Sequence, residues 1–312
     1  MSKPNDGMTL PPSAPQRLRP GVLLPHGRFA WWYALLGAAL TAGGLIGFIW
    51  LKIRWLPHSS FMDSASILSQ GLLFVLAALL TPLLASRRVY AQDFPAPRGM
   101  LLWRTAVVLL VWIVMQAMSM WFERSVSGAE EASKQVARWL GLGQGVWPDV
   151  AVVLAVTVMA PLGEELFFRG LLYRSLRDGV ARWLPMLPSA ALGMVLSSLL
   201  FAVMHVGDGQ DTQWPALFVM GILMALSYEW TGSLLAPMMV HALNNMLALA
   251  QAMALPDIQV STDWMYTLTA ASPLIVLAVG WGLLRALPNA PAAMPAADPQ
   301  SAAPMPPPGS NP

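Results

Sequence analysis

The chain alternates between long apolar runs and short polar segments. Eight runs stand out, and each approaches the roughly 20 apolar residues that a helix needs to cross the hydrocarbon core of a bilayer. They cover residues 31–51, 66–85, 100–121, 149–168, 189–206, 214–230, 234–252 and 265–287. The fourth to seventh runs are shorter or interrupted by polar residues, which is typical of helices that face one another rather than lipid. The pattern predicts an all-α, polytopic membrane protein with about eight transmembrane helices.

The composition agrees with this fold class. The 312 residues are 56% hydrophobic and 11% charged, whereas soluble domains carry about 25% charged residues. The chain contains no cysteine, which excludes disulfides and thiolate zinc sites. We expect a membrane-embedded domain over residues 30–287, between a polar, Pro-rich tail over 1–29 and a Pro- and Ala-rich tail over 288–312. Both tails lack apolar periodicity and are expected to be disordered.

The distribution of the 18 Lys and Arg residues predicts the orientation of the chain. If the N-terminus is cytoplasmic, thirteen of them fall on the cytoplasmic side. The five on the outside are Lys52, Arg54, Arg124, Lys134 and Arg138. By the positive-inside rule, both termini are expected in the cytoplasm. We expect a multi-pass protein of the inner (plasma) membrane, with the first run kept as an uncleaved helix.

Charged residues at the end of the fourth run form the first candidate site. A charge at the centre of a membrane helix costs roughly 2.5–3.5 kcal/mol on insertion scales. Glu165 and Arg169 are four residues apart and share one helix face, so they can form an ion pair. Glu164 is rotated by one residue and stays free for chemistry. The pair of glutamates is expected toward the cytoplasmic end of the fourth helix, and the alternative is that all three residues simply mark a helix end at the headgroups.

Imidazole and amide side chains occur in two later apolar runs. His205 closes the fifth run, and the seventh contains His241 and Asn245, one turn apart on one face, so that both can point at one spot. Asn244 lies about 100° off that face and is the weaker candidate. The other two of the four histidines lie in polar segments. Structural roles, such as hydrogen bonds between helices, are the alternative for each of these residues.

These side chains together can hydrolyse an amide bond. A carboxylate in a partly dry site can take a proton from water, and a nearby imidazole can hold the same water. A second imidazole and an amide N–H can donate to the oxyanion that develops on the scissile carbonyl. A metal site is the competing chemistry, because Glu164, His205 and His241 are an acceptable set of zinc ligands with water in the fourth position. No HExxH motif is present, so the sequence leaves open whether a divalent metal such as zinc takes part.

Other functional classes receive less support. The chain has no GxSxG, Walker loop or GxGxxG motif, which argues against a serine hydrolase and a nucleotide enzyme. It shows no internal repeat of the kind that secondary transporters usually carry. A non-catalytic membrane protein that binds a peptide, as in bacteriocin immunity or sorting, remains an alternative. The expected partners are the lipid bilayer and a membrane-associated protein or peptide, and no nucleic acid.

Three motifs in this order along the chain resemble a known family. They are Glu164-Glu165-x-x-x-Arg169, Phe201-x-x-x-His205 and His241-x-x-x-Asn245. The pattern is similar to that of the CPBP family, which contains CAAX prenyl-protease-like and bacteriocin-processing intramembrane proteases and is also called the Abi family. The resemblance covers roughly residues 148–250. It implies an intramembrane endopeptidase with eight helices and a polar cavity that opens toward the cytoplasm and the bilayer.

The resemblance also implies a role for each motif residue. Glu164 and His205 would activate the attacking water, and His241 and Asn245 would form the oxyanion hole. Glu165 and Arg169 would support the site structurally. Family members have been described both as metalloproteases and as glutamate proteases, so the metal question stays open. Eukaryotic relatives cleave prenylated CAAX proteins and bacterial relatives are linked to bacteriocin maturation or self-immunity, and we do not expect a prenylated substrate here.

Overall fold

The computed structural model describes residues 30–55, 60–84, 98–125, 134–136, 140–205, 213–256 and 258–286. Within these ranges all regular structure is helical. The predicted tails, 1–29 and 288–312, lie outside the described residues. The all-α fold class is therefore confirmed for the part of the chain that bears the apolar runs.

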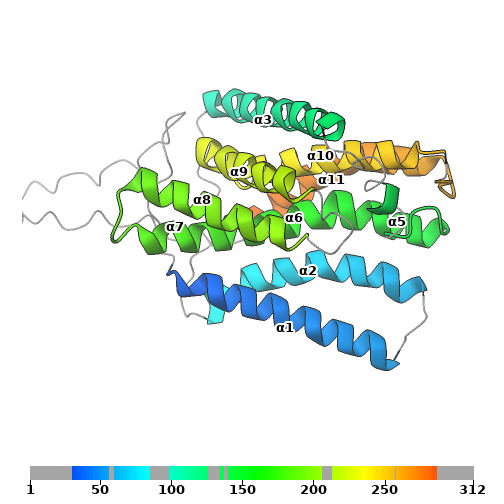
Figure 1. The fold of residues 1–312 in the computed structure, drawn as a ribbon, viewed down its shortest axis with the longest axis horizontal. Helices are drawn as coiled ribbons and strands as arrows, with labels where there is room; N and C mark the ends of the chain where they lie inside the picture. Colours follow the sequence, from blue (N-terminus) through cyan, green and yellow to red (C-terminus); the bar gives the residue numbers. More distant parts are fainter. Residues whose placement is uncertain are drawn as a thin grey trace, which may run out of the picture.

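Each of the eight apolar runs forms a helix (Figure 1). The first three are α1 (Trp32–Trp55), α2 (Ser60–Leu84) and α3 (Arg98–Ser125). The fourth is one continuous helical stretch, here called the central helix, made of α5 (Val146–Leu154), η1 (Ala155–Met159), α6 (Ala160–Glu165), η2 (Leu166–Tyr173) and α7 (Arg174–Val180). The last four are α8 (Met186–Val203), α9 (Trp214–Thr231), α10 (Leu235–Met253) and α11 (Trp264–Ala286).

Five of these helices are long and apolar enough to cross a membrane. They cover residues Trp32–Leu51, Leu101–Ser125, Val146–Val180, Met186–Val203 and Trp264–Arg285. In α2 only the shorter stretch Leu68–Thr81 qualifies as apolar among the described residues. Helices α9 and α10 contain buried polar side chains, including Glu229 and His241, which lower their hydropathy. The polytopic membrane fold is confirmed; among the described residues, five helices are long and apolar enough to cross a membrane by themselves, so the count of eight spans is approximate.

The central helix is longer than the predicted run 149–168. It extends from Val146 to Val180, so the glutamate pair lies near its middle. The expectation that the pair lies toward the cytoplasmic end of the fourth helix is therefore wrong. The apolar pattern stops near residue 168, but the helix continues because its later charges are buried in the protein.

Three arginines beyond Glu165 are paired inside the protein. Arg169 contacts Glu165 at 2.8 Å, Arg174 contacts Asp178 at 3.5 Å, and Arg177 contacts Glu229 at 2.8 Å. Burial of a charge is tolerated when a partner compensates it. These arginines consequently do not lie in a loop. Without them, ten of the thirteen cationic residues assigned to the cytoplasmic side remain, compared with five on the outer side. The excess of positive charge therefore stays on the cytoplasmic side.

The central helix packs between α1 and α2 on one side and α8 to α11 on the other (Figure 1). Its most apolar window is 72% buried, compared with 17% for α1 and α3. Phe74 of α2, Phe167, Phe168 and Phe201 of α8 form a chain of ring contacts, with successive centroids 5.1 Å apart. A Cβ atom on Gly163 would collide with the carbonyl oxygen of Gly71, so this glycine lets α2 approach the glutamate pair closely.

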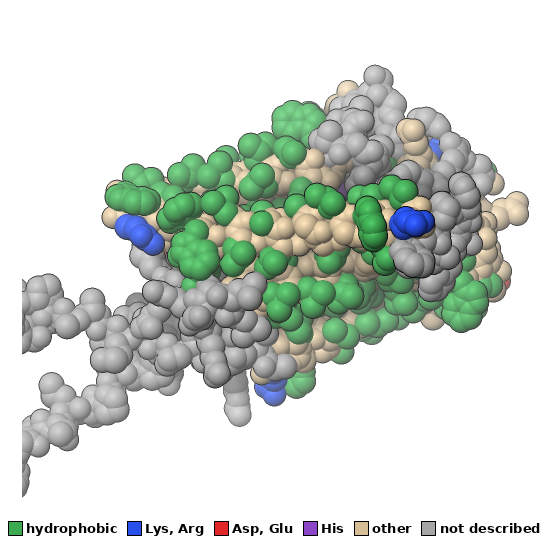
Figure 2. Space-filling model, turned by 90° about the horizontal axis from the view of Figure 1, so that it is seen from below, with side chains coloured by type: hydrophobic (Ala, Val, Ile, Leu, Met, Phe, Trp, Pro, Cys, Tyr) green, Lys and Arg blue, Asp and Glu red, His purple; other side chains and the backbone are tan. Residues whose placement is uncertain are grey.

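The lateral surface of the bundle is apolar. Figure 2 shows one face on which hydrophobic side chains predominate, with Lys and Arg near its margins. Large side chains that lie more than 60% exposed include Leu35, Ile46, Trp121, Leu187 and Leu274. Such a surface is suited to contact with lipid, because every backbone group of a helix is already paired within the helix.

Candidate active site

The glutamate pair lies on a short α-helical turn between two π-helical segments, η1 and η2. Single π turns inside α-helices are rare and are frequent at functional sites. In η1 the N–H of Ala160 donates to the carbonyl of Ala155, five residues earlier. The same pattern would pair the carbonyl of Val156 with the N–H of residue 161, but this residue is Pro161 and has no N–H. The Val156 carbonyl is thereby left for a side-chain donor.

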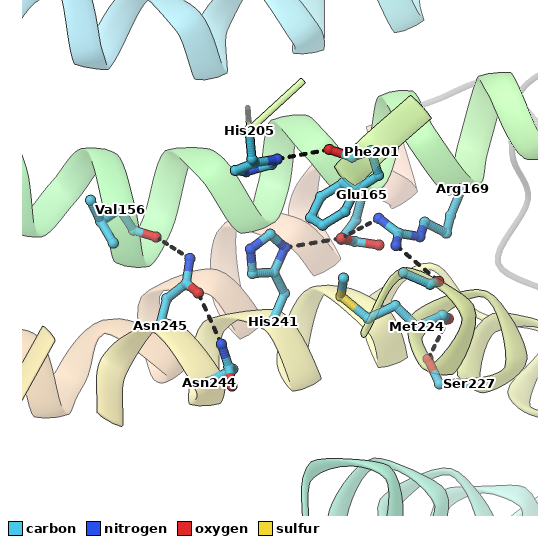
Figure 3. Close-up of polar contacts among 11 residues, drawn as sticks. Val156, Glu165, Arg169, Phe201, His205, Met224, Ser227, His241, Asn244 and Asn245 are labelled. Atoms are coloured by element: carbon cyan, nitrogen blue, oxygen red, sulfur yellow. Dashed lines mark hydrogen bonds and ion pairs between the residues drawn. The ribbon is translucent and has the colours of Figure 1, made fainter. Parts of the chain in front are cut away.

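Glu165 is fully buried and holds two cationic or ionisable partners (Figure 3). Its Oε1 accepts a hydrogen bond from Arg169 Nη1 at 2.8 Å and another from His241 Nδ1 at 2.9 Å. Arg169 Nη2 also donates to the carbonyl of Gly221 at 3.0 Å, and its guanidinium carbon lies 4.8 Å from the ring centre of Phe201. The predicted pair of Glu165 and Arg169 is confirmed. The additional bond to His241 joins the central helix to α10.

The bond to Glu165 determines which nitrogen of His241 is available for chemistry. A carboxylate oxygen in contact with a guanidinium is an acceptor, so His241 Nδ1 carries the hydrogen. The remaining ring nitrogen, Nε2, accepts in the neutral ring and donates in the doubly protonated ring. His241 lines the cavity described below, although only 3% of the residue is exposed. A carboxylate behind the imidazole fixes the orientation of the ring.

His205 follows the C-terminal end of α8 and is oriented by a backbone contact. Its Nδ1 donates to the carbonyl of Phe201 at 2.8 Å, since a carbonyl can only accept. The centres of the two rings lie 4.7 Å apart. As in His241, the Nε2 atom is the one that remains for a ligand or a water molecule.

Asn245 lies one turn after His241 on α10 (Figure 3). Its Nδ2 donates to the free carbonyl of Val156 at 2.9 Å, and its Oδ1 accepts from Asn244 Nδ2 at 3.4 Å. The contact with Val156 ties α10 to η1. Sequence spacing identified Asn245 but offered no reason to expect this partner.

Glu164, His205, His241 and Asn245 line one cavity of about 750 Å³. Glu164 is half-buried, and its Oε2 has no hydrogen-bond partner among the described residues. Glu165 and Arg169 do not line the cavity and lie behind its wall. The structure therefore brings together the four residues expected to do chemistry and separates them from the two expected to support them.

The metal alternative receives no geometric support. Among the described side chains, no group of three or more His, Asp or Glu residues is arranged to hold a metal ion. Glu164, His205 and His241 line the same cavity but do not form such a group.

The cavity lies in the half of the bundle away from the described chain ends. It is lined by the second half of α3 (Met115 to Arg124), the C-terminal end of α8, the first half of α9 and the second half of α10 together with Leu255. In Figure 1 these parts of the helices lie to the right, whereas α1 begins at the left. The side of the membrane toward which the cavity opens and the cytoplasmic location of the termini both stay predictions.

Gln116 of α3 is a cavity residue that the sequence reasoning missed. Its Nε2 donates to Asn244 Oδ1 at 3.2 Å. A signal was present, because Gln116 is the only amide side chain in the apolar run 100–121. Pro161 was a second signal, since a proline inside a helix removes one backbone donor.

The comparisons with known proteins concern the same part of the chain. Residues 146–247 match the family described as type II CAAX prenyl endopeptidase Rce1-like. The membrane-embedded CAAX protease MroQ of Staphylococcus aureus (strain USA300) is 30% identical over 94 residues, which cover 30% of this chain and 36% of that protein. An uncharacterized 24.3 kDa protein of Escherichia coli is 30% identical over 95 residues, covering 30% of this chain and 41% of that protein. The protein YpbD of Bacillus subtilis (strain 168) is 25% identical over 149 residues, which cover 43% of this chain and 69% of that protein.

No solved structure matches the chain at a significant level. The chain spans about two fifths or less of the length of the first two relatives. The matched segment nevertheless contains all three motifs and overlaps the segment 148–250 on which the resemblance was based. The match over residues 146–247 therefore supports the resemblance to CAAX-type intramembrane proteases.

Proposed function

We propose that the protein is an intramembrane endopeptidase that hydrolyses a peptide bond of a membrane-associated protein or peptide. The observation that carries this proposal is the single cavity that Glu164, His205, His241 and Asn245 share within an apolar helical bundle. The match to an endopeptidase family over the segment that contains Glu164, His205, His241 and Asn245 supports it. So does the similarity to MroQ, which is named a CAAX protease.

Water activation is assigned to Glu164 and His205. The Glu164 carboxylate, whose residue lines the cavity, takes one proton from the water. The other O–H of the same water donates to His205 Nε2, because Nδ1 is already bound to the Phe201 carbonyl. The water oxygen then attacks the carbonyl carbon of the scissile peptide. A C–O bond forms, and the electron pair of the C=O moves to the oxygen.

Oxyanion stabilisation is assigned to His241 and Asn245. In the doubly protonated ring, His241 Nε2–H donates to the oxyanion while Nδ1–H remains on Glu165. Asn245 uses one of its two N–H groups on the Val156 carbonyl and offers the other. When the tetrahedral intermediate collapses, the proton held by Glu164 passes to the leaving nitrogen and the C–N bond breaks. None of these reaction steps requires a metal ion.

The buried pair of Glu165 and Arg169 supports this arrangement from behind the cavity wall. The Glu165 carboxylate accepts from His241 Nδ1–H and so fixes the ring with Nε2 as the atom left to contact an oxyanion. Arg169 pairs with the negative charge of Glu165, and its other guanidinium nitrogen is held by the Gly221 carbonyl. We propose a positioning role for these two residues.

Hydrolysis is tested on purified protein in detergent with a library of membrane-associated peptides. The variants Glu164→Gln and His205→Ala are expected to lower kcat by roughly 10²–10⁴-fold, the usual contribution of a general base. Thermal unfolding of each variant checks that the fold is kept. Cleavage by both folded variants at the rate of the wild type would refute the mechanism.

The non-catalytic alternative loses one of its supports. Recognition of a peptide carboxylate by Arg169 would need the guanidinium at the cavity, but it is 1% exposed and already bound to Glu165 and Gly221. A complementation assay with Glu164→Ala separates the two functions, because a protein that only binds would keep its effect in the cell.

We also propose that residues 30–287 form one domain in the plasma membrane with both termini in the cytoplasm. When the three buried arginines are left out, ten cationic residues fall on the cytoplasmic side and five on the outer side, which supports this orientation. The helix segments that line the cavity would then lie in the half of the membrane away from the cytoplasm. The scissile bond would lie in that half of the bilayer, opposite to what the family resemblance implies.

A further inference from the structure

A chain of three carboxamide groups crosses the cavity wall from α3 to the central helix. Gln116 Nε2 donates to Asn244 Oδ1 at 3.2 Å, and Asn244 Nδ2 donates to Asn245 Oδ1 at 3.4 Å. Asn245 Nδ2 donates to the Val156 carbonyl at 2.9 Å. All three amide side chains line the cavity and are half-buried.

One backbone carbonyl determines the direction of the whole chain. The Val156 oxygen can only accept, so Asn245 must present its NH₂ group to it. The Oδ1 of Asn245 then faces Asn244, which must donate in turn, and Oδ1 of Asn244 requires a donor from Gln116. The orientation of each amide therefore follows from hydrogen-bond chemistry. The carbonyl is free because Pro161 lacks the N–H that would bond it in the π turn.

We propose that Gln116 and Asn244 are positioning residues that hold the Asn245 amide with its second N–H available to the cavity. This inference rests on the proposed function, in which that N–H donates to the oxyanion. Gln116 belongs to α3, outside the segment 146–247 that matches the protease family. A helix beyond the family domain thus completes the site.

Counting donors shows how the chain can be broken in two different ways. Three contacts need three donors, and Gln116, Asn244 and Asn245 each supply one. Gln116→Glu replaces the first donor with a carboxylate, so three contacts share two donors and two oxygens must face each other somewhere in the chain. Gln116→Met keeps a similar shape and removes the donor without adding a charge. The glutamate variant should therefore be the more damaging.

The test compares kcat of these variants across pH, each as a ratio to the wild type. Gln116→Glu is expected to lower kcat by roughly 10–100-fold, which is less than the 10²–10³-fold cost of removing an oxyanion donor outright. At low pH the introduced carboxyl gains a proton and can donate again. The ratio should then recover for Gln116→Glu, whereas it should stay constant for Gln116→Met.

A matched control separates this effect from that of a new charge in the cavity. Gln70 of α2 lines the same cavity, and Gln70→Glu introduces the same carboxylate away from the amide chain. Its loss of kcat should be smaller. The other charged or titratable groups near position 116 are Glu123 and Arg124 on α3, and Glu164, His205 and His241 across the cavity. These groups are present in every variant and in the wild type. Their contribution to the pH dependence of kcat therefore cancels when each variant is divided by the wild type.

Equal losses for Gln116→Glu and Gln70→Glu, or no recovery of Gln116→Glu at low pH, would overturn the inference while leaving the proposed hydrolysis intact. If the wild type hydrolyses no peptide, the proposed function fails, and the amide chain is tested without activity. The side-chain ¹⁵N–¹H signals of Asn245, identified by their loss in Asn245→Asp, should then shift in Gln116→Glu and stay in place in Gln70→Glu. Unchanged signals in both variants would refute the chain itself.

Discussion

Two adjacent glutamates offer a sharp test, because the same substitution should have different consequences at each. Glu164→Gln changes a half-buried carboxylate at the cavity, with one oxygen that bonds to no described residue. Glu165→Gln changes a fully buried carboxylate whose Oε1 accepts from Arg169 and His241. The first is expected to remove activity and spare stability. The second is expected to lower both.

The size of the effect follows from the burial of the ion pair. Glu165 and Arg169 are 0% and 1% exposed, so the guanidinium left by Glu165→Gln has no water to replace the lost anion. Removing one partner of a buried pair costs about 3–5 kcal/mol. At about 2–4 °C per kcal/mol for a chain of 150–250 residues, this lowers Tm on the order of 10 °C. For Glu164→Gln, where no buried charge loses its partner, the free energy of unfolding should change by less than about 1 kcal/mol.

Thermal unfolding in detergent, monitored by the helical circular dichroism signal, measures the stability of each variant. Peptide cleavage measures its activity. The double variant Glu165→Gln with Arg169→Met provides a further control, because removing both charges should recover part of the lost stability. A Tm for Glu165→Gln within 2 °C of that for Glu164→Gln would contradict the reasoning, since the buried ion pair would then contribute nothing measurable.

Three further predictions follow from the site. Pro161→Ala restores an N–H that competes with Asn245 for the Val156 carbonyl, so kcat should fall by roughly tenfold on the scale of a misplaced group while Tm stays the same or rises; unchanged cleavage would show that this contact is dispensable. Because the chain has no cysteine, Gln213→Cys at the cavity and Ser301→Cys in the C-terminal tail can be labelled singly with a membrane-impermeant maleimide. In right-side-out vesicles only Gln213→Cys should react, and the reverse pattern would place the termini outside. Activity should survive a strong zinc chelator, since no described group of three His, Asp or Glu side chains is arranged for a metal; loss that added zinc restores would establish a metal-bound water.

The positions of the helices could be predicted because hydrophobicity is a local property. Each apolar run corresponds to one helix, and the i, i+4 spacing of Glu165 and Arg169 predicted their ion pair. The same spacing placed His241 and Asn245 on one face of α10, where both line the cavity. The length of the central helix was not predictable in this way. Its later arginines look like loop charges until Glu229, about fifty residues further on, is seen to pair with Arg177.

The all-helical membrane fold, the three motifs and the division between a free and a paired glutamate could be predicted from the order of residues along the chain. Three contacts became visible only in the packed bundle: His241 is held by Glu165, Asn245 is oriented by the Val156 carbonyl, and Gln116 joins the site from α3. The physical reason is the range of each interaction. Burial and helical spacing are set by neighbours within a few residues, whereas the orientation of a buried polar side chain depends on partners that only the packing of separate helices brings within 3 Å or so.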